Sequence, residues 1–225
     1  MIEDIRTRKK HLRKKTLALR DTLPQEERKK KSISIQQHLF SLPEFIAAKT
    51  VALFTSFRSE VLTELMIRDA LALSKTVVLP VTDLTNRRLV FSRLVDYAED
   101  LSPGTWGILE PKPACIRPVA PEAMNMVITP GAVFDPAGNR IGYGGGFYDG
   151  LLASFHKPAV ALAFSLQLIE SVPMEPGHDV PVDMIITEDG KVITEDSEDA
   201  WKMSMDDHTR SLEFIGKIKT DAPIE

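Results

Sequence analysis

A glycine-rich stretch between residues 130 and 149 holds the residue types best suited to chemistry in this chain. Six of the 12 glycines lie between Gly131 and Gly146. Glycine lets backbone N–H groups approach an anion closely and adopts positive φ without penalty. Arg140 adds a planar guanidinium, and a helix expected after the glycines would direct its positive end to the same place. The stretch therefore predicts a cradle for phosphate.

This stretch differs from the two best-known phosphate-binding motifs. It is not a Walker A loop, because no Gly-Lys-Ser/Thr follows four residues after a glycine. It is not a dinucleotide fingerprint either, because Phe147 stands where the last glycine would fall. On glycine content alone, a flexible turn or a close strand–helix contact is the alternative. Asp149 favours a phosphate site over this alternative. A carboxylate and a phosphate that lie side by side need a cation between them, and Mg²⁺ is the usual cation.

The charge of the chain is divided between a basic start and an acidic remainder. Residues 1–31 hold 12 of the 28 Lys and Arg but only 5 of the 32 Asp and Glu. The net charge of −4 thus combines +7 in this segment with −11 in the other residues. Such an arm fits nucleic-acid binding, a helix whose lysines face water, or cations that fold back onto a small molecule's phosphate. The absence of interleaved aromatic residues argues against a stacking platform for single strands.

Apolar spacing predicts the helices that position these groups. Ile5, Leu12 and Leu19 recur every seven residues and indicate one helix with a narrow apolar stripe. A capping box over 22–25 predicts that a second helix begins near Pro24 and continues to about Ser41. Two further helices are expected over residues 62–73 and 148–155.

Short apolar runs predict the strands. They cover residues 50–54, 76–79, 88–94, 126–129, 132–134, 159–164, 184–187 and 192–193. The proline-rich residues 100–125 are expected to form a long irregular connection. Because strands and helices alternate, the sequence predicts an α/β domain with a largely parallel sheet.

Composition excludes several classes of protein. The single cysteine, Cys115, permits no intrachain disulfide and no thiolate zinc cluster, so a reducing, cytoplasmic location is expected. The N-terminus lacks the apolar segment of a secretory signal. No apolar run approaches the roughly 20 residues that span a bilayer. A length of 225 residues fits one domain with an appendage.

The run from Pro130 to Asp149 resembles the signature of the 5-formyltetrahydrofolate cyclo-ligases, also called methenyltetrahydrofolate synthetases. Other features in the family's order and spacing are Lys10, Arg13, Ser59-Glu60-Val61, Pro111, Gln167, Pro173, His178-Asp179 and Val182-Asp183. The resemblance implies a single-domain, three-layer Rossmann-like α/β sandwich over residues 1–195, with a basic helical segment at 1–41. The resemblance does not extend to residues 196–225, where the composition shifts to 8 Asp and Glu against 4 Lys and Arg and predicts a C-terminal extension that is partly helical around 209–218.

The resemblance also implies a reaction. Such enzymes use ATP and Mg²⁺ to close 5-formyltetrahydrofolate to 5,10-methenyltetrahydrofolate, with release of ADP and phosphate. The formyl oxygen is expected to attack the γ-phosphate and give a phosphorylated, imidate-like intermediate. N10 of the folate then adds to the activated carbon, and phosphate departs. Phosphoryl transfer depends on positioning and neutralised charge more than on covalent help from the protein.

The resemblance assigns ATP to two segments of the chain. Lys10 and Arg13 would reach the phosphates from the first helix, although without the resemblance they would be interpreted as surface cations. The glycine-rich loop would wrap the triphosphate, and Arg140 and Tyr148 would act in catalysis. The ATP-binding residues of the loop are Arg140, Ile141, Gly142, Tyr143, Gly144, Gly145, Gly146, Phe147 and Tyr148.

Folate and magnesium are assigned in the same way. Glu60 would accept two parallel hydrogen bonds from the pterin ring, and Asp149 and Asp183 would be hard oxygen ligands of Mg²⁺. Considered alone, Glu60 fits a helix N-terminus and Asp183 fits a turn. His178-Asp179 is expected to form a structural turn, because no second His or Cys lies at ligand spacing. The other folate-lining residues would be Thr55, Gly144, Gly145, Gly146, Phe147 and Tyr148.

Two other classes of function are kept as alternatives. A paralogue with the same fold could act as a sugar-phosphate isomerase or a CoA transferase, and it would then be indifferent to ATP. A non-catalytic module could use the basic arm on nucleotides or nucleic acid, with binding that falls steeply with salt. The leading hypothesis predicts small-molecule partners only, without nucleic acid or membrane, and a monomer, with a dimer as the alternative.

Overall fold

Seven of the eight predicted apolar runs overlap strands of one sheet in the computed structural model, which describes residues 4–193. The eighth, 132–134, instead contains β8 (Val133–Phe134), which pairs with β9 (Arg140–Ile141) in a separate hairpin. The sheet has eight strands in the order β12-β11-β10-β7-β1-β2-β3-β6. The predicted extension over 196–225 and its helix near 209–218 lie outside the described residues. The strands are β1 (Thr50–Ala52), β2 (Thr76–Asp83), β3 (Arg88–Arg93), β6 (Pro118–Val119), β7 (Met126–Thr129), β10 (Ala159–Leu162), β11 (Met184–Thr187) and β12 (Gly190–Ile193).

The centre of the sheet is parallel, as the sequence predicts. Strand β1 pairs in parallel with both β2 and β7, and β10 pairs in parallel with both β7 and β11. Antiparallel strands β3, β6 and β12 complete the two edges. Since the chain leaves β1 toward β2 on one side and toward β7 on the other, the order of strands reverses at β1. Open α/β sheets bind ligands at such a switch point, beyond the carboxyl ends of the strands.

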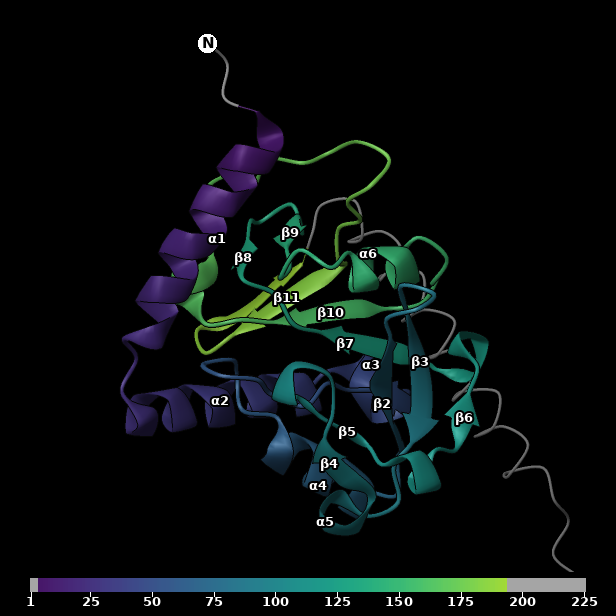
Figure 1. The fold of residues 1–225 in the computed structure, drawn as a ribbon. Helices are drawn as coiled ribbons and strands as arrows, with labels where there is room; N and C mark the ends of the chain where they lie inside the picture. The colour runs from purple at the N-terminus through teal and green to yellow at the C-terminus, as the bar shows by residue number, and fades with distance from the viewer. Residues whose placement is uncertain (1–3, 194–225) are drawn as a thin grey trace, which may run out of the picture.

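Helices cover both faces of the sheet, which confirms the predicted layered α/β fold (Figure 1). Alternate residues of each strand face opposite layers, so Val51 packs with α2, α3 and α4, whereas Ala52 packs on the side of α6. The helices are α1 (Ile5–Asp21), α2 (Gln25–Phe40), α3 (Pro43–Ala47), α4 (Glu64–Ala72), α5 (Tyr97–Asp100) and α6 (Phe147–Leu152). None of the described helices is both long and apolar enough to cross a membrane.

Helix α1 lies along one side of the molecule, beside the small hairpin of β8 (Val133–Phe134) and β9 (Arg140–Ile141) (Figure 1). The predicted seven-residue stripe is wrong, because Leu19 is 52% exposed. The inward face instead carries Leu12, Thr16 and Arg20, at the spacing of a regular α-helix. Polar and charged side chains of α1 therefore turn inward.

Two further predictions need correction. The capping box at 22–25 does not form, because α2 has Pro24 at its N-cap and Thr22 donates its hydroxyl to the carbonyl of Leu19. The segment 100–125 is not wholly irregular: β4 (Leu101–Pro103) pairs with β5 (Leu109–Pro111), and β6 joins the main sheet. Proline at the ends of these strands conceals them in the sequence, because it breaks the apolar alternation.

We predict that Gly131→Ala destabilises the protein by about 1–3 kcal/mol, because core overpacking costs that much. A Cβ at this position would lie 2.4 Å from Cζ of the buried Phe134, so the ring or the loop must move. Gly150 is the matched control, since a Cβ there meets nothing within 4 Å. Gly150→Ala should raise stability by roughly 0.5–1 kcal/mol, as alanine does inside a helix. Urea unfolding of the two variants measures both effects, and equal stabilities would contradict the prediction.

Candidate active site

A cavity of about 1320 Å³ lies at the carboxyl ends of the parallel strands. The segment after β1 contributes Phe54 and Thr55, strand β2 contributes Pro80 and Thr82, and Pro130 follows β7. Helix α1 and the glycine-rich loop form the walls that face these strand ends. A typical pocket for one small ligand measures about 300–1,000 Å³. This cavity therefore has room for two substrates.

The glycine-rich loop has the open backbone that the sequence predicts. Gly144 and Gly146 have φ values of 100° and 71°, in the region that side chains disfavour. Gly145 is required for a different reason, because a Cβ there would lie 2.6 Å from the ring of Phe147. The loop leads into α6, which has only six residues. The cradle therefore depends on loop N–H groups and nearby cations more than on a helix dipole.

Arg140 is a buried cation at the base of this loop. Its side chain is 2% exposed, and Nη2 donates to Oδ1 of Asp149 at 2.8 Å. Its Nε is buried and has no hydrogen-bond partner within the described part of the chain. Arg140 also lies 5.8 Å from the ring of Tyr148, whose pKa is raised by burial and by the charge of Glu60. The site therefore holds a guanidinium with an unused donor beside a protonated phenol.

Helix α1 brings further cations to the same cavity. Arg13 donates from Nε to the carbonyl of Gly142 at 2.6 Å, and burial lowers its pKa. Lys10 also lines the cavity, as predicted, and so do Arg6 and Lys9. Lys9 is the more enclosed of the two lysines and forms an ion pair with Asp179. Sequence reasoning missed Lys9, although its spacing of four residues from Arg13 places both cations on one helix face.

A carboxylate occupies the other side of the cavity. Glu60 is buried, its Oε2 accepts the N–H of Phe57 at 2.8 Å, and its Oε1 accepts the hydroxyl of Tyr143. Burial raises the pKa of Glu60, whereas these two hydrogen bonds and the charge of Arg20 oppose that rise. Thr55 lines the same wall, but its hydroxyl donates to the carbonyl of Leu109 at 2.6 Å. Thr55 therefore holds the β5 segment in place.

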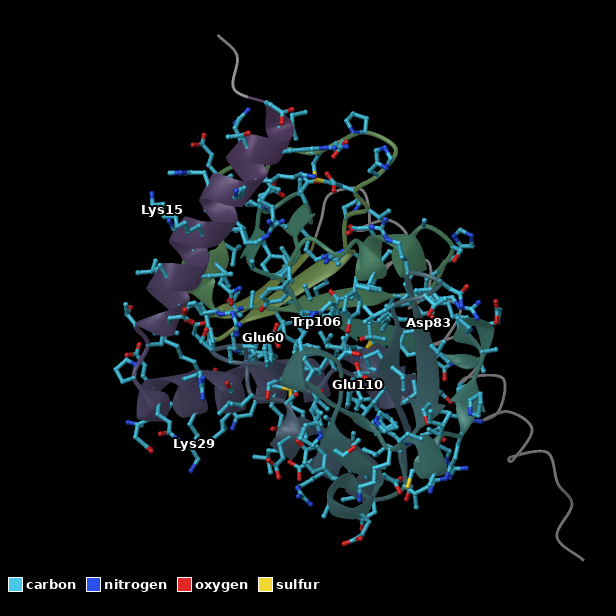
Figure 2. The ribbon with its side chains drawn as sticks, viewed as in Figure 1. Lys15, Lys29, Glu60, Asp83, Trp106 and Glu110 are labelled. Carbon is cyan, nitrogen blue, oxygen red and sulfur yellow. The ribbon has the colours of Figure 1, made fainter. Side chains whose placement is uncertain are left out.

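Two lining residues near β5 were not predicted. Figure 2 shows Glu110 and Trp106 near the centre of the view with Glu60, whereas Lys15 and Lys29 lie at the periphery. Glu110 is buried and accepts the hydroxyl of Thr82 at 2.8 Å. Trp106 is 62% exposed and lies edge-on to Phe147, with ring centroids 6.0 Å apart. An isolated tryptophan followed by glycine in a loop was the available signal.

The structure does not bring the two predicted magnesium ligands together as lining groups. Asp149 lines the cavity, whereas Asp183 does not, and its Oδ2 accepts the N–H of Ala159 at the start of β10. The described residues contain no cluster of three or more His, Cys, Asp or Glu that could hold a metal. Mg²⁺ is commonly held by one or two carboxylates together with substrate phosphates. Asp149 fits that arrangement, and Asp183 is a strand-edge acceptor.

The predicted turn at His178-Asp179 forms, because backbone N–H groups of both residues donate to the carbonyl of Glu175. Both residues also line the cavity, and Asp179 forms an ion pair with Lys9. A second ion pair joins Arg6 to Glu175 at 2.9 Å. These pairs attach the start of α1 to the loop that precedes β11.

Charge is distributed unevenly around the cavity. The α1 wall and the glycine-rich loop carry Arg13, Lys10 and Arg140, whereas the buried carboxylates Glu60 and Glu110 lie toward the ends of β1 and β2. Charges of the opposite sign also line each side, namely Asp149 and Asp179 on the first and Arg58 and Arg87 on the second. The first end suits a polyanion, and the second suits a neutral ring with N–H donors. A large cavity at the switch point of a parallel sheet is the usual catalytic position in open α/β enzymes, and this chain is an enzyme of that class.

Comparison with known proteins identifies the family within that class. Residues 5–188 match the 5-formyltetrahydrofolate cyclo-ligase family, and the chain belongs to it. It is therefore a ligase of folate one-carbon metabolism, as the sequence motifs indicate.

Individual relatives agree with this assignment. The 5-formyltetrahydrofolate cyclo-ligase of Haemophilus influenzae is 36% identical over an alignment of 155 residues, and the match covers 66% of this chain and 81% of that protein. The enzyme of that name from Mus musculus is 32% identical, over 74% of this chain and 87% of its own length. The solved structure of Aquifex aeolicus 5,10-methenyltetrahydrofolate synthetase has a TM-score of 0.73 and 34% identity, and the match covers 83% of this chain and 93% of that chain.

We predict that Trp106 reports on occupancy of the cavity. The chain has two tryptophans, so Trp201→Phe leaves Trp106 as the single reporter. Its ring is exposed beside Phe147, and a ligand that fills the cavity will remove water from it. The emission maximum should move to shorter wavelength when 5-formyltetrahydrofolate is added, after correction for ligand absorbance. An unchanged maximum at saturating ligand would place the ligand elsewhere.

Proposed function

We propose that this protein catalyses the ATP- and Mg²⁺-dependent cyclisation of 5-formyltetrahydrofolate to 5,10-methenyltetrahydrofolate, with release of ADP and phosphate. The observation that carries the proposal is the large cavity, which is lined by cations of α1, by the glycine-rich loop and by the buried carboxylates Glu60 and Glu110. Membership of the cyclo-ligase family supports the same conclusion. ATP is the co-substrate that this family implies.

The triphosphate occupies the basic end in this proposal. Lys10 and Arg13 reach it from α1, and Lys9 adds a third cation from the same helix face. N–H groups of Gly144 to Gly146 lie along the phosphates, since the loop leaves its backbone uncovered by side chains. Arg140, at the base of the loop, places its positive charge near the transferred phosphoryl group. These groups neutralise charge that spreads over the phosphoryl oxygens in the transition state.

The folate occupies the other end. The Glu60 carboxylate accepts N–H groups from the pterin ring, and Thr55 and the residues from Gly144 to Tyr148 line the space between ring and phosphate. Tyr148 keeps its proton because burial raises its pKa, so its hydroxyl can donate to an oxygen of the reacting group. Holding formyl oxygen and γ-phosphate in line supplies much of the rate, since positioning replaces a bimolecular encounter.

Magnesium is held by Asp149 together with the phosphates of ATP in this proposal. When bound, the ion neutralises charge on the β- and γ-phosphates. The chain's own part is to present the carboxylate, which Arg140 holds at 2.8 Å. Because Asp183 does not line the cavity, we do not assign it a ligand role.

The proposed reaction has two chemical steps. The formyl oxygen attacks the γ-phosphorus, the bond to ADP breaks, and a phosphorylated imidate-like intermediate forms. N10 then adds to the activated carbon and loses its proton, and the C–O bond breaks as phosphate leaves.

The alternative functions have less support. A sugar-phosphate isomerase or a CoA transferase would also bind phosphate, and the match of residues 5–188 to the cyclo-ligase family favours the ligase over both. Binding of nucleic acid through the basic arm has less support because four of its cations line the cavity, namely Arg6, Lys9, Lys10 and Arg13, although Arg6, Lys10, Lys15 and Lys29 are also exposed. Because one chain supplies every wall of the cavity, we propose that the monomer is active. A cytoplasmic location stays a prediction.

The activity itself is the first test. Incubation of the purified protein with 5-formyltetrahydrofolate and Mg-ATP should produce the ultraviolet absorbance of the methenyl product, together with one ADP per product. Omission of ATP should abolish the signal, which separates the ligase from an ATP-independent enzyme of the same fold. A folded protein that forms neither product nor ADP would disprove the proposed function.

We predict that Asp149→Asn lowers kcat by roughly 100-fold, because the metal supplies several kcal/mol of transition-state stabilisation. Asparagine retains an oxygen that can accept from Arg140, so the fold should persist. Titration of activity with Mg²⁺ should show a higher half-saturating concentration in the variant. Asp183→Asn is the matched control, and its Mg²⁺ titration should superimpose on that of the wild type. If Asp183→Asn alone changes the titration, the metal role belongs to Asp183.

A further inference from the structure

Arg20 is a buried cation that neither the motifs nor the proposed function uses. It lies in the last turn of α1, a helix rich in solvent-exposed Lys and Arg, yet only 2% of its surface is exposed. It does not line the cavity but lies behind its wall. Arginine is seldom buried unless it is paired, because removing a charge from water is costly. The position of Arg20 therefore calls for a role that compensates this cost.

The guanidinium of Arg20 joins three segments of the cavity wall. Nε donates to the hydroxyl of Ser59 at 3.0 Å, Nη1 donates to the carbonyl of Gly131 at 3.3 Å, and Nη2 donates to the hydroxyl of Tyr143 at 3.0 Å. These acceptors follow β1, follow β7 and belong to the glycine-rich loop. All three are neutral oxygens. The charge of Arg20 is therefore compensated through its neighbours.

Each of the two hydroxyl groups that accept from Arg20 also donates a hydrogen bond to a carboxylate. Ser59 donates to Oδ1 of Asp21, and Tyr143 donates to Oε1 of Glu60. Asp21 is exposed at the end of α1, whereas Glu60 is buried in the cavity wall. Tyr143 itself is 44% exposed, and its hydroxyl lies between Arg20 and Glu60. The chain Arg20–Tyr143–Glu60 therefore leads from behind the wall to the proposed pterin-binding carboxylate.

We propose that Arg20 is a positioning residue for folate binding, which acts through Tyr143 to hold the Glu60 carboxylate as a hydrogen-bond acceptor for the pterin ring. The inference rests on the proposed function of Glu60. Without the guanidinium, the Tyr143 hydroxyl loses the donor that orients it. Glu60 would then lose its aligned partner, and only the N–H of Phe57 would hold it.

Electrostatics gives this arrangement a second effect. Burial raises the pKa of Glu60, and the positive charge of Arg20 opposes the rise. The other titratable groups that face Glu60 are Tyr143 and Tyr148, both protonated because burial and the charge of Glu60 raise their pKa values. Folate binding that needs ionised Glu60 weakens as pH falls through the pKa of this group. Removal of Arg20 raises the pKa of Glu60. As the pH is lowered, the variant will therefore lose folate binding at a higher pH than the wild type does.

The test measures the dissociation constant of 5-formyltetrahydrofolate without ATP, as a function of pH. Loss of one charge-assisted hydrogen bond corresponds to about a tenfold change in a binding constant. Arg20→Met should therefore raise the dissociation constant at neutral pH by about tenfold and move the pH at which binding is lost upward. Arg20→Lys should give an intermediate value, since an ammonium keeps the charge but not the fork geometry.

Two matched variants separate this role from general damage to α1. Arg8→Met removes an equal charge from an exposed position on the same helix and should leave the dissociation constant and its pH dependence unchanged. Ser59→Ala removes one acceptor of Arg20 but retains the link to Tyr143. It should lower thermal stability with less than a twofold change in folate binding.

A double-mutant cycle with Tyr143→Phe completes the test. Tyr143→Phe alone should weaken binding and move the pH dependence in the same direction as Arg20→Met, and adding Arg20→Met to it should cost little more. Equal losses from Arg20→Met in both backgrounds, with an unchanged pH profile, would overturn the proposal and leave Arg20 a structural residue. If Arg20→Met does not fold, Arg20→Lys and Tyr143→Phe decide the question. A wild-type protein that binds no folate would instead refute the proposed function.

Discussion

The attachment of α1 to the glycine-rich region is the interaction on which the cavity depends. Arg13 donates to the carbonyl of Gly142, and Arg20 donates to the carbonyl of Gly131. Gln167 donates to the same Gly131 oxygen from the other side, at 2.9 Å. A loop rich in glycine has little side-chain packing of its own, so donors from neighbouring elements must fix its carbonyls. Without α1 the strands of the sheet would still pair with one another, but the loop would lose the Arg13 and Arg20 side chains that donate to its carbonyl groups.

The central strands were predictable from sequence because the apolar residues that form each of them are contiguous in the chain. β7 and β11 are four-residue apolar runs, buried on both sides as parallel strands must be, and their predicted limits agree with the structure. The α1 face was not predictable in this way. Arg20 and Lys9 belong to a basic run that suits a solvated helix, and only the fold reveals that their partners are Tyr143 and Asp179.

In the candidate site, too, residues that are contiguous in the sequence were easier to predict than residues that only the fold brings together. Most of it was found because residues 130–149 are contiguous, and the cavity also collects the distant residues Lys10, Arg13, Thr55 and Glu60 assigned by resemblance. Glu110 and Trp106 were missed because short strands ending in proline enter the wall from a segment that looks irregular. The two residues assigned to Mg²⁺ by the resemblance lie differently in the fold, since Asp149 lines the cavity and Asp183 does not.

The ion pairs at the start of α1 have a consequence for how the chain matures. Arg6 and Lys9 bond to Glu175 and Asp179, about 170 positions later in the sequence. During synthesis, α1 leaves the ribosome long before the loop over 175–179, so its charged groups cannot form these ion pairs until that loop has been made. Contacts of such long separation close late and slow folding. The α1 wall of the cavity is thus assembled only after most of the described domain has been synthesised.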